Sequence, residues 1–150
     1  MGVSFFSGPK ILKLNVRPFH NKPHPFHYRI YGEGPPLLLL HGFPDFSYGW
    51  RYQIEALSKK FKVIVPDLKG YGKSEKPIGP EKYCLPVICR DVIHFIHELK
   101  YEKVHIAGHD WGGIIAWAMA RYWSKYIDKL IIISAPHPIR FRDVLESSPK

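Results

Sequence analysis

Hydrophobic and polar positions along the chain follow two periods, one typical of strands and one typical of helices. Residues 10–16 and 27–34 alternate in polarity and predict half-exposed strands, the second ending in a glycine-rich turn. Residues 37–40 and 62–67 are short apolar runs, which predict strands buried on both faces of a sheet. Further strands are predicted over 103–108 and 129–135.

Helical spacing separates these strands. Trp50, Ile54 and Leu57 fall on one face of a predicted helix, and residues 112–123 predict another. A longer amphipathic helix is predicted by apolar residues three or four positions apart: Leu85, Ile88, Val92, Phe95 and Leu99. Strands alternating with helices indicate the α/β class, with a mostly parallel sheet covered by helices on both faces.

Length and composition agree with one globular unit. The chain has 150 residues, of which 45% are hydrophobic, enough for a core. We expect residues 1–24 to form an N-terminal extension with the first strand, and residues 25–150 to form the main domain. The net charge of +9 comes from scattered lysines and arginines with no long basic run, which favours a solvated basic surface over a nucleic-acid partner.

The cysteines and the hydropathy of the chain indicate where in the cell the protein is expected. Cys84 and Cys89 fit neither a metal-binding pair nor a disulfide framework, which favours a reducing environment. No apolar run is long enough to span a bilayer, and the N-terminus is a poor signal peptide. We therefore expect an intracellular location and leave membrane association open.

The stretch GHDWGG, at 108–113, lies between a predicted strand and a predicted helix. A residue at the tip of such a turn is strained, and the residues two before and two after it crowd each other. Gly108 and Gly112 meet that need around Asp110, and the N–H of Trp111 is placed to bind an oxyanion. The pattern predicts an exposed, ionised nucleophile, while the same residues alone also fit a helix N-cap aspartate.

A second motif, HGFP, follows the first buried strand. An acyl-transfer site needs a second backbone donor opposite the first, and the N–H of Phe43 can supply it. Gly42 allows close approach and Pro44 fixes the turn, whereas His41 is expected to be buried and structural. An ordinary strand-ending turn is the alternative interpretation.

Glycines also punctuate residues 66–77, which read PDLKGYGKSEKP. Gly70 and Gly72 lie too close together for the pattern of a phosphate-binding loop. We therefore expect a structural loop after another strand.

In this order, HGFP, DLKGYGKS, GHDWGG and the APHP at 135–138 resemble the α/β-hydrolase superfamily, specifically its epoxide hydrolase branch of the vertebrate 3/4 type. The resemblance runs from about residue 25 to the end. It implies the α/β-hydrolase fold (an AB hydrolase-1 domain), of which this chain would hold the N-terminal half, with the cap and last strands absent. Lys69 stands where the family usually has arginine and cannot form the same bidentate bonds, which affects the anchoring of its loop.

The resemblance implies that Asp110 opens an epoxide, forming an alkyl ester that water hydrolyses to a diol. The N–H groups of Phe43 and Trp111 would form the oxyanion hole for the second step. The implied substrate is a small-molecule or lipid epoxide, and no cofactor is expected. A haloalkane dehalogenase-like enzyme is an alternative, although many such enzymes have asparagine at the position of Phe43, and fluoroacetate dehalogenases typically have arginine at that of Trp111. A non-catalytic α/β-hydrolase-like binding module is a further alternative.

The resemblance also implies parts that these 150 residues do not supply, namely two cap tyrosines, a late acid and a base histidine. Only His137 follows Asp110, and it matches a position at the start of the cap, so we do not expect it to be the base. We predict ester formation without multiple turnover. Relatives of this type are often anchored to the endoplasmic reticulum by a preceding helix that this chain lacks, so cytoplasmic and reticulum-associated locations are both favoured.

The remaining expectations concern surfaces. Residues 129–135 would form an apolar sheet edge that promotes self-association. His94 and His97 lie three apart on a helix with no third ligand, so no metal site is expected. We expect these two and the histidines of the proline-rich stretch, His20, His24 and His27, to be exposed.

Overall fold

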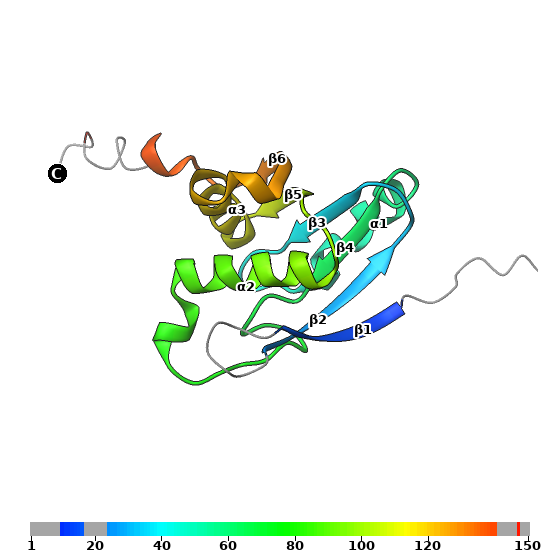
Figure 1. Cartoon of the computed structure of the whole chain (residues 1–150). Helices are drawn as coiled ribbons and strands as arrows, with labels where there is room; N and C mark the ends of the chain where they lie inside the picture. The colour runs from blue at the N-terminus through cyan, green and yellow to red at the C-terminus, as the bar shows by residue number, and fades with distance from the viewer. Residues whose placement is uncertain (1–9, 17–23, 141–146, 148–150) are drawn as a thin grey trace, which may run out of the picture.

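Among the described residues, six strands form one sheet in the order β1-β2-β4-β3-β5-β6 (Figure 1). The computed structural model describes residues 10–16, 24–140 and 147. The strands are β1 (Lys10–Val16), β2 (His24–Tyr31), β3 (Pro36–Leu40), β4 (Lys62–Pro66), β5 (Val104–His109) and β6 (Ile127–Ile133). The pairs β1–β2 and β2–β4 are antiparallel, and β3 pairs in parallel with β4 and β5, as β5 does with β6. The predicted mostly parallel sheet is confirmed.

Helices cover both faces of this sheet, as the alternating pattern predicted. The α-helices are α1 (Arg51–Leu57), α2 (Leu85–Glu98) and α3 (Trp111–Tyr122), and the 3-10 helices are η1 (Ser47–Trp50), η2 (Pro80–Tyr83) and η3 (Ser124–Tyr126). None of the helices in the described part of the chain is both long and apolar enough to cross a membrane.

Alternate side chains of the central strands supply two separate cores, which is why the strands read as continuous apolar runs. Leu37 and Leu39 of β3 pack with Trp50 under α1. Leu38 and Leu40, on the opposite face, pack with residues of α2 and α3. Figure 1 shows α2 and α3 in front of the sheet and α1 behind it.

The last strand lies two residues earlier than predicted. Polarity alone suggested 129–135, but β6 spans Ile127–Ile133. Ser134 has a φ of 50°, in the left-handed region, and such a residue cannot continue a strand. The strand therefore ends one residue before it.

The strand β6 is the last in the sheet order, so its outer edge pairs with no other strand in the described part of the chain. Side chains on one of its two faces are exposed to solvent. Ile131 and Ile133 are 48% and 39% exposed, while Leu130 and Ile132 pack partly against the core under α3. The predicted apolar edge is present, and self-association through it stays a prediction.

The parallel strands end along one edge of the sheet, which brings their following loops together. Leu40 of β3 lies opposite Gly108 of β5, so the residues after both strands are neighbours.

Candidate active site

Asp110 occupies a sharp turn between β5 and α3. Its φ and ψ are 52° and −117°, a conformation that non-glycine residues rarely adopt. Its N–H donates to the carbonyl of Ile133 at 3.1 Å, which fixes the turn against β6. Asp110 stands at the N-cap position of α3, but its side chain makes no N-cap hydrogen bond there.

Two backbone donors converge on the Asp110 carboxylate. The N–H of Phe43 donates to Oδ1 at 2.9 Å, across 67 positions of sequence. This bond, followed by that of the Trp111 N–H, lowers the pKa of Asp110 below its ordinary value, against a smaller opposing effect of burial. The aspartate is therefore ionised at neutral pH, and Oδ2 is the oxygen that Phe43 leaves unbonded.

Three glycines permit this convergence by close backbone contact. A Cβ on Gly42 would lie 2.6 Å from the Asp110 Cβ, and one on Gly108 would lie 2.3 Å from the carbonyl oxygen of Gly112. Gly112 is held to glycine by a second contact that the sequence pattern does not predict. A Cβ there would meet the carbonyl oxygen of Leu40 at 2.2 Å, so Gly112 is required by the end of β3 more than by Gly108.

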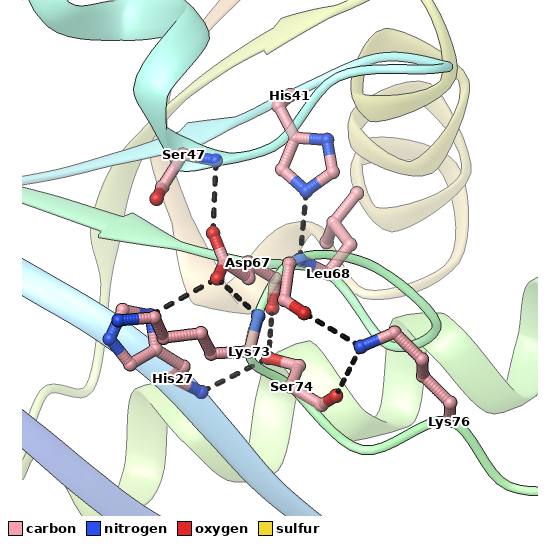
Figure 2. A network of polar contacts seen from close by, with 9 residues as sticks. His27, His41, Ser47, Asp67, Leu68, Lys73, Ser74 and Lys76 are labelled. Carbon is pink, nitrogen blue, oxygen red and sulfur yellow. Dashed lines mark hydrogen bonds and ion pairs between the residues drawn. The ribbon is translucent and has the colours of Figure 1, made fainter.

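His41 is a buried structural residue, as expected. Its Nδ1 lies 2.9 Å from the carbonyl oxygen of Gly42, and its Nε2 accepts the N–H of Leu68 at 2.8 Å. Burial lowers the pKa of His41, which favours the neutral ring with its proton on Nδ1. Both ring nitrogens are therefore used in joining the loop after β3 to the loop after β4, and Figure 2 shows the Leu68 bond.

The Phe43 and Trp111 side chains lie at the surface of the site. They are 64% and 51% exposed, although both backbones contact the carboxylate. The peptide bond between Phe43 and Pro44 is cis. Large aromatic side chains left bare around a polar centre are typical of a surface that receives an apolar ligand or covering element.

Asp67 is the centre of a polar network in the loop after β4 (Figure 2). It is 1% exposed and accepts the N–H groups of Ser47 at 3.0 Å and Lys73 at 2.8 Å. Burial raises the pKa of Asp67, but these hydrogen bonds outweigh it and the net pKa is lowered. The expected structural loop is therefore built around a buried carboxylate that also binds the loop after β3.

His27 belongs to the same network, which corrects the expectation that it is exposed. It is 4% exposed, and its Nδ1 lies 3.1 Å from Oδ2 of Asp67. Its backbone N–H donates to the hydroxyl of Ser74 at 3.0 Å. No local pattern could reveal this, because the partner carboxylate lies 40 positions away. His20 and the side chain of His24 lie outside the described residues.

Lys69 anchors its loop through a buried ion pair. Its Nζ contacts Oδ2 of Asp91 in α2 and donates to the carbonyl of Lys82 at 3.2 Å. Both members of the pair are buried. Although lysine lacks the bidentate geometry of arginine, the loop after β4 is thereby tied to α2.

The remaining candidates lie elsewhere. The ring of His137 stacks edge-to-face on Trp117 at 4.6 Å. Cys84 and Cys89 are free thiols, and burial raises the pKa of Cys89 to about 12. Within the described ranges, no cluster of three or more histidine, cysteine, aspartate or glutamate side chains could hold a metal ion.

Comparison with known proteins connects this site to a family. The family model described as the alpha/beta hydrolase fold matches residues 35–147. The chain belongs to this family. The match begins just before β3 and so includes both loops of the site.

Individual relatives point to the epoxide hydrolase branch. The chain is 43% identical to human epoxide hydrolase 4 and 39% identical to epoxide hydrolase 3 of Xenopus tropicalis, in each case over 126 residues and 83% of this chain. A solved epoxide hydrolase from Bacillus megaterium superimposes with a TM-score of 0.84 at 39% identity, covering 91% of this chain. The predicted resemblance to this branch is confirmed.

These relatives are longer than the chain. It spans 35% of human epoxide hydrolase 4, 34% of the Xenopus protein and 46% of the Bacillus megaterium chain. The fold and the branch are therefore established for the matched part.

Proposed function

We propose that this chain carries the nucleophile and oxyanion hole of an epoxide hydrolase, with Asp110 as the nucleophile. The observation that carries the proposal is the 2.9 Å hydrogen bond from the Phe43 N–H to Oδ1 of an aspartate at a strained strand–helix turn. Similarity to named epoxide hydrolases supports the choice of an epoxide as substrate.

In this proposal the two carboxylate oxygens have different tasks, which the bond from Phe43 to Oδ1 supports. Oδ2 attacks an epoxide carbon, the carbon–oxygen bond breaks, and the ring oxygen leaves as an alkoxide that takes up a proton. Oδ1 then becomes the carbonyl oxygen of the alkyl ester. When water attacks Cγ, negative charge develops on Oδ1, to which the N–H of Phe43 already donates, while the N–H of Trp111 also bonds the same carboxyl group.

The same donors explain why the acid is ready to react. They lower the pKa of Asp110 and keep it ionised, so no base is needed for the first step. Ester hydrolysis is different, because it needs a base that activates water. Both ring nitrogens of His41 are already bonded, and His137 stacks on Trp117, so we assign the base to neither.

Intact-mass spectrometry tests the proposal on the purified 150-residue chain. With excess aryl epoxide, we expect one adduct per chain, heavier by the mass of the whole epoxide, and no steady formation of diol. Asp110→Asn should abolish the adduct. A matched haloalkane distinguishes the dehalogenase alternative, since that chemistry releases halide, and an absence of any adduct would favour the non-catalytic alternative.

A further inference from the structure

The loop after β4 contacts the loop after β3 at three places. The loop after β4 comprises residues 67–74, and we name residues 41–47 of the loop after β3 the oxyanion loop. The Leu68 N–H donates to His41 at 2.8 Å, and the Ser47 N–H donates to Asp67 at 3.0 Å. These two bonds, both drawn in Figure 2, hold the beginning and the end of the oxyanion loop.

The third contact is made by Tyr71 with the first half of the oxyanion loop. Its ring lies edge-to-face with His41, at 5.1 Å and 78° between centroids and planes, and with Phe43, at 6.5 Å and 77°. One aromatic ring therefore touches the residues on both sides of Gly42. Such perpendicular aromatic pairs are favoured arrangements with preferred geometry.

Tyr71 is itself fixed by its own loop. Its N–H donates to the carbonyl of Leu68 at 2.9 Å, and its carbonyl accepts the N–H of Ser74 at 3.0 Å. The side chain is partly buried against the core under α2 and α3. Tyr71 is thus held by backbone hydrogen bonds and by partial burial of its ring. The Phe43 residue that it contacts is 64% exposed.

We infer that Tyr71 is a positioning residue, whose ring holds the backbone N–H of Phe43 in line with the Asp110 carboxylate. The inference rests on the proposed function, since that N–H is one of the two oxyanion donors. Burial of Phe43 cannot set its position, because most of that side chain is in solvent. Hydrogen bonds hold the ends of the oxyanion loop, and the Asp45 N–H donates to the Gly42 carbonyl at 3.1 Å within it, while the Tyr71 ring is the contact made to the Phe43 side chain from the loop after β4.

The charge on Asp110 also acts on Tyr71. Burial, and then the nearby Asp110 carboxylate, raise the pKa of the Tyr71 phenol. The phenol therefore remains neutral, and its ring packs without adding a second negative charge beside the nucleophile.

Nuclear magnetic resonance on the whole chain tests the inference without requiring any reaction. The readouts are the titration of the Asp110 carboxyl carbon and the hydrogen exchange of the Phe43 amide. For Tyr71→Leu we expect the Asp110 midpoint to move up towards its ordinary value, and Phe43 exchange to accelerate on the order of tenfold. Tyr71→Phe keeps the ring and should behave as the parent.

Tyr126→Leu is the matched control, because Tyr126 makes a similar edge-to-face contact with His97, at 5.0 Å and 69°, on another part of the fold. It should lower thermal stability but leave the Asp110 midpoint and Phe43 exchange unchanged. Should Tyr71→Leu fail to fold, Tyr71→Met fills similar volume without a ring and carries the same expectations. Parent-like titration and exchange in the folded ring-deleted variant overturn the inference.

The epoxide reaction separates the two claims. If no chain forms an adduct, the proposed function fails, and the titration and exchange still decide whether Tyr71 positions Phe43. If the adduct forms, the inference predicts slower hydrolysis of the ester in Tyr71→Leu than in Tyr71→Phe, because one oxyanion donor is loosened. Equal hydrolysis rates in these two variants count against it.

Discussion

Replacing Gly112 with alanine puts a methyl group into the contact between the α3 N-terminus and the end of β3. The added Cβ would lie 2.2 Å from the Leu40 oxygen, 2.5 Å from the Leu40 carbonyl carbon and 2.7 Å from the His41 oxygen. All three atoms belong to backbone, so no side chain can rotate away. Because ordinary contacts begin near 3.5 Å, the turn has to move by roughly 1 Å.

This displacement has two expected effects. Overpacking of this kind costs about 1–3 kcal/mol, and we expect the upper end because only backbone can respond. A displacement of the Asp110 carboxylate by roughly 1 Å should also misplace the attacking oxygen and slow adduct formation about 100-fold. Urea unfolding followed by circular dichroism measures the first effect, and the rate of mass gain with an aryl epoxide measures the second.

Gly49→Ala provides the matched control. Its Cβ would lie even closer to a neighbour, at 1.9 Å, but that atom is Oδ2 of Asp45, the far end of a side chain that can turn. We expect its unfolding free energy to remain within about 1 kcal/mol of the parent, helped by the preference for alanine in a helix. If Gly112→Ala is as stable and as reactive as Gly49→Ala, the close-contact reasoning is wrong.

Three further predictions concern buried charge and pH. Lys69→Met leaves Asp91 buried without its partner and should cost about 3–5 kcal/mol in urea unfolding, whereas adding Asp91→Leu should restore most of the loss; an additive double variant would contradict this. Because the pKa of Asp67 is lowered in the folded protein, the ionised carboxylate stabilises the fold fully above the unfolded-state pKa, and this stabilisation declines as the pH falls through the folded-state pKa. The Asp67→Asn variant should therefore have a lower free energy of unfolding than the parent at neutral pH, but its stability should depend less on pH in acid. Because the pKa of Asp110 is lowered, adduct formation at about pH 4, where an ordinary aspartate is about half protonated, should stay above half of its neutral rate; a rate at or below half there would refute the assignment.

Periodicity was sufficient to locate the elements of the parallel sheet. The apolar runs before HGFP and GHDWGG are β3 and β5, and the amphipathic stretch from Leu85 is α2. Both loops of the site follow directly from these strands, since parallel strands end at one edge. Local patterns succeed here because buried strands and amphipathic helices impose their periods on adjacent residues.

Local sequence patterns do not predict the long-range contacts that hold the site together. His27 reaches Asp67 across 40 positions, and Phe43 reaches Asp110 across 67. Gly108 crowds Gly112, as the turn pattern predicts, but the contact of Gly112 with the end of β3 is not visible in that pattern. The glycine pattern of residues 66–77 likewise predicts a loop but no partner for the Tyr71 ring. In each case the partner is chosen by the three-dimensional arrangement of strands, which no short stretch of sequence encodes.

The central claim is that the carboxylate of Asp110 attacks the substrate. After reaction with an aryl epoxide, proteolysis and tandem mass spectrometry locate the added group on a single residue. The account predicts one alkyl ester, on Asp110, that is absent from Asp110→Asn and is lost with hydroxylamine. An adduct on another residue, or an equal yield of adduct in Asp110→Asn, would contradict it.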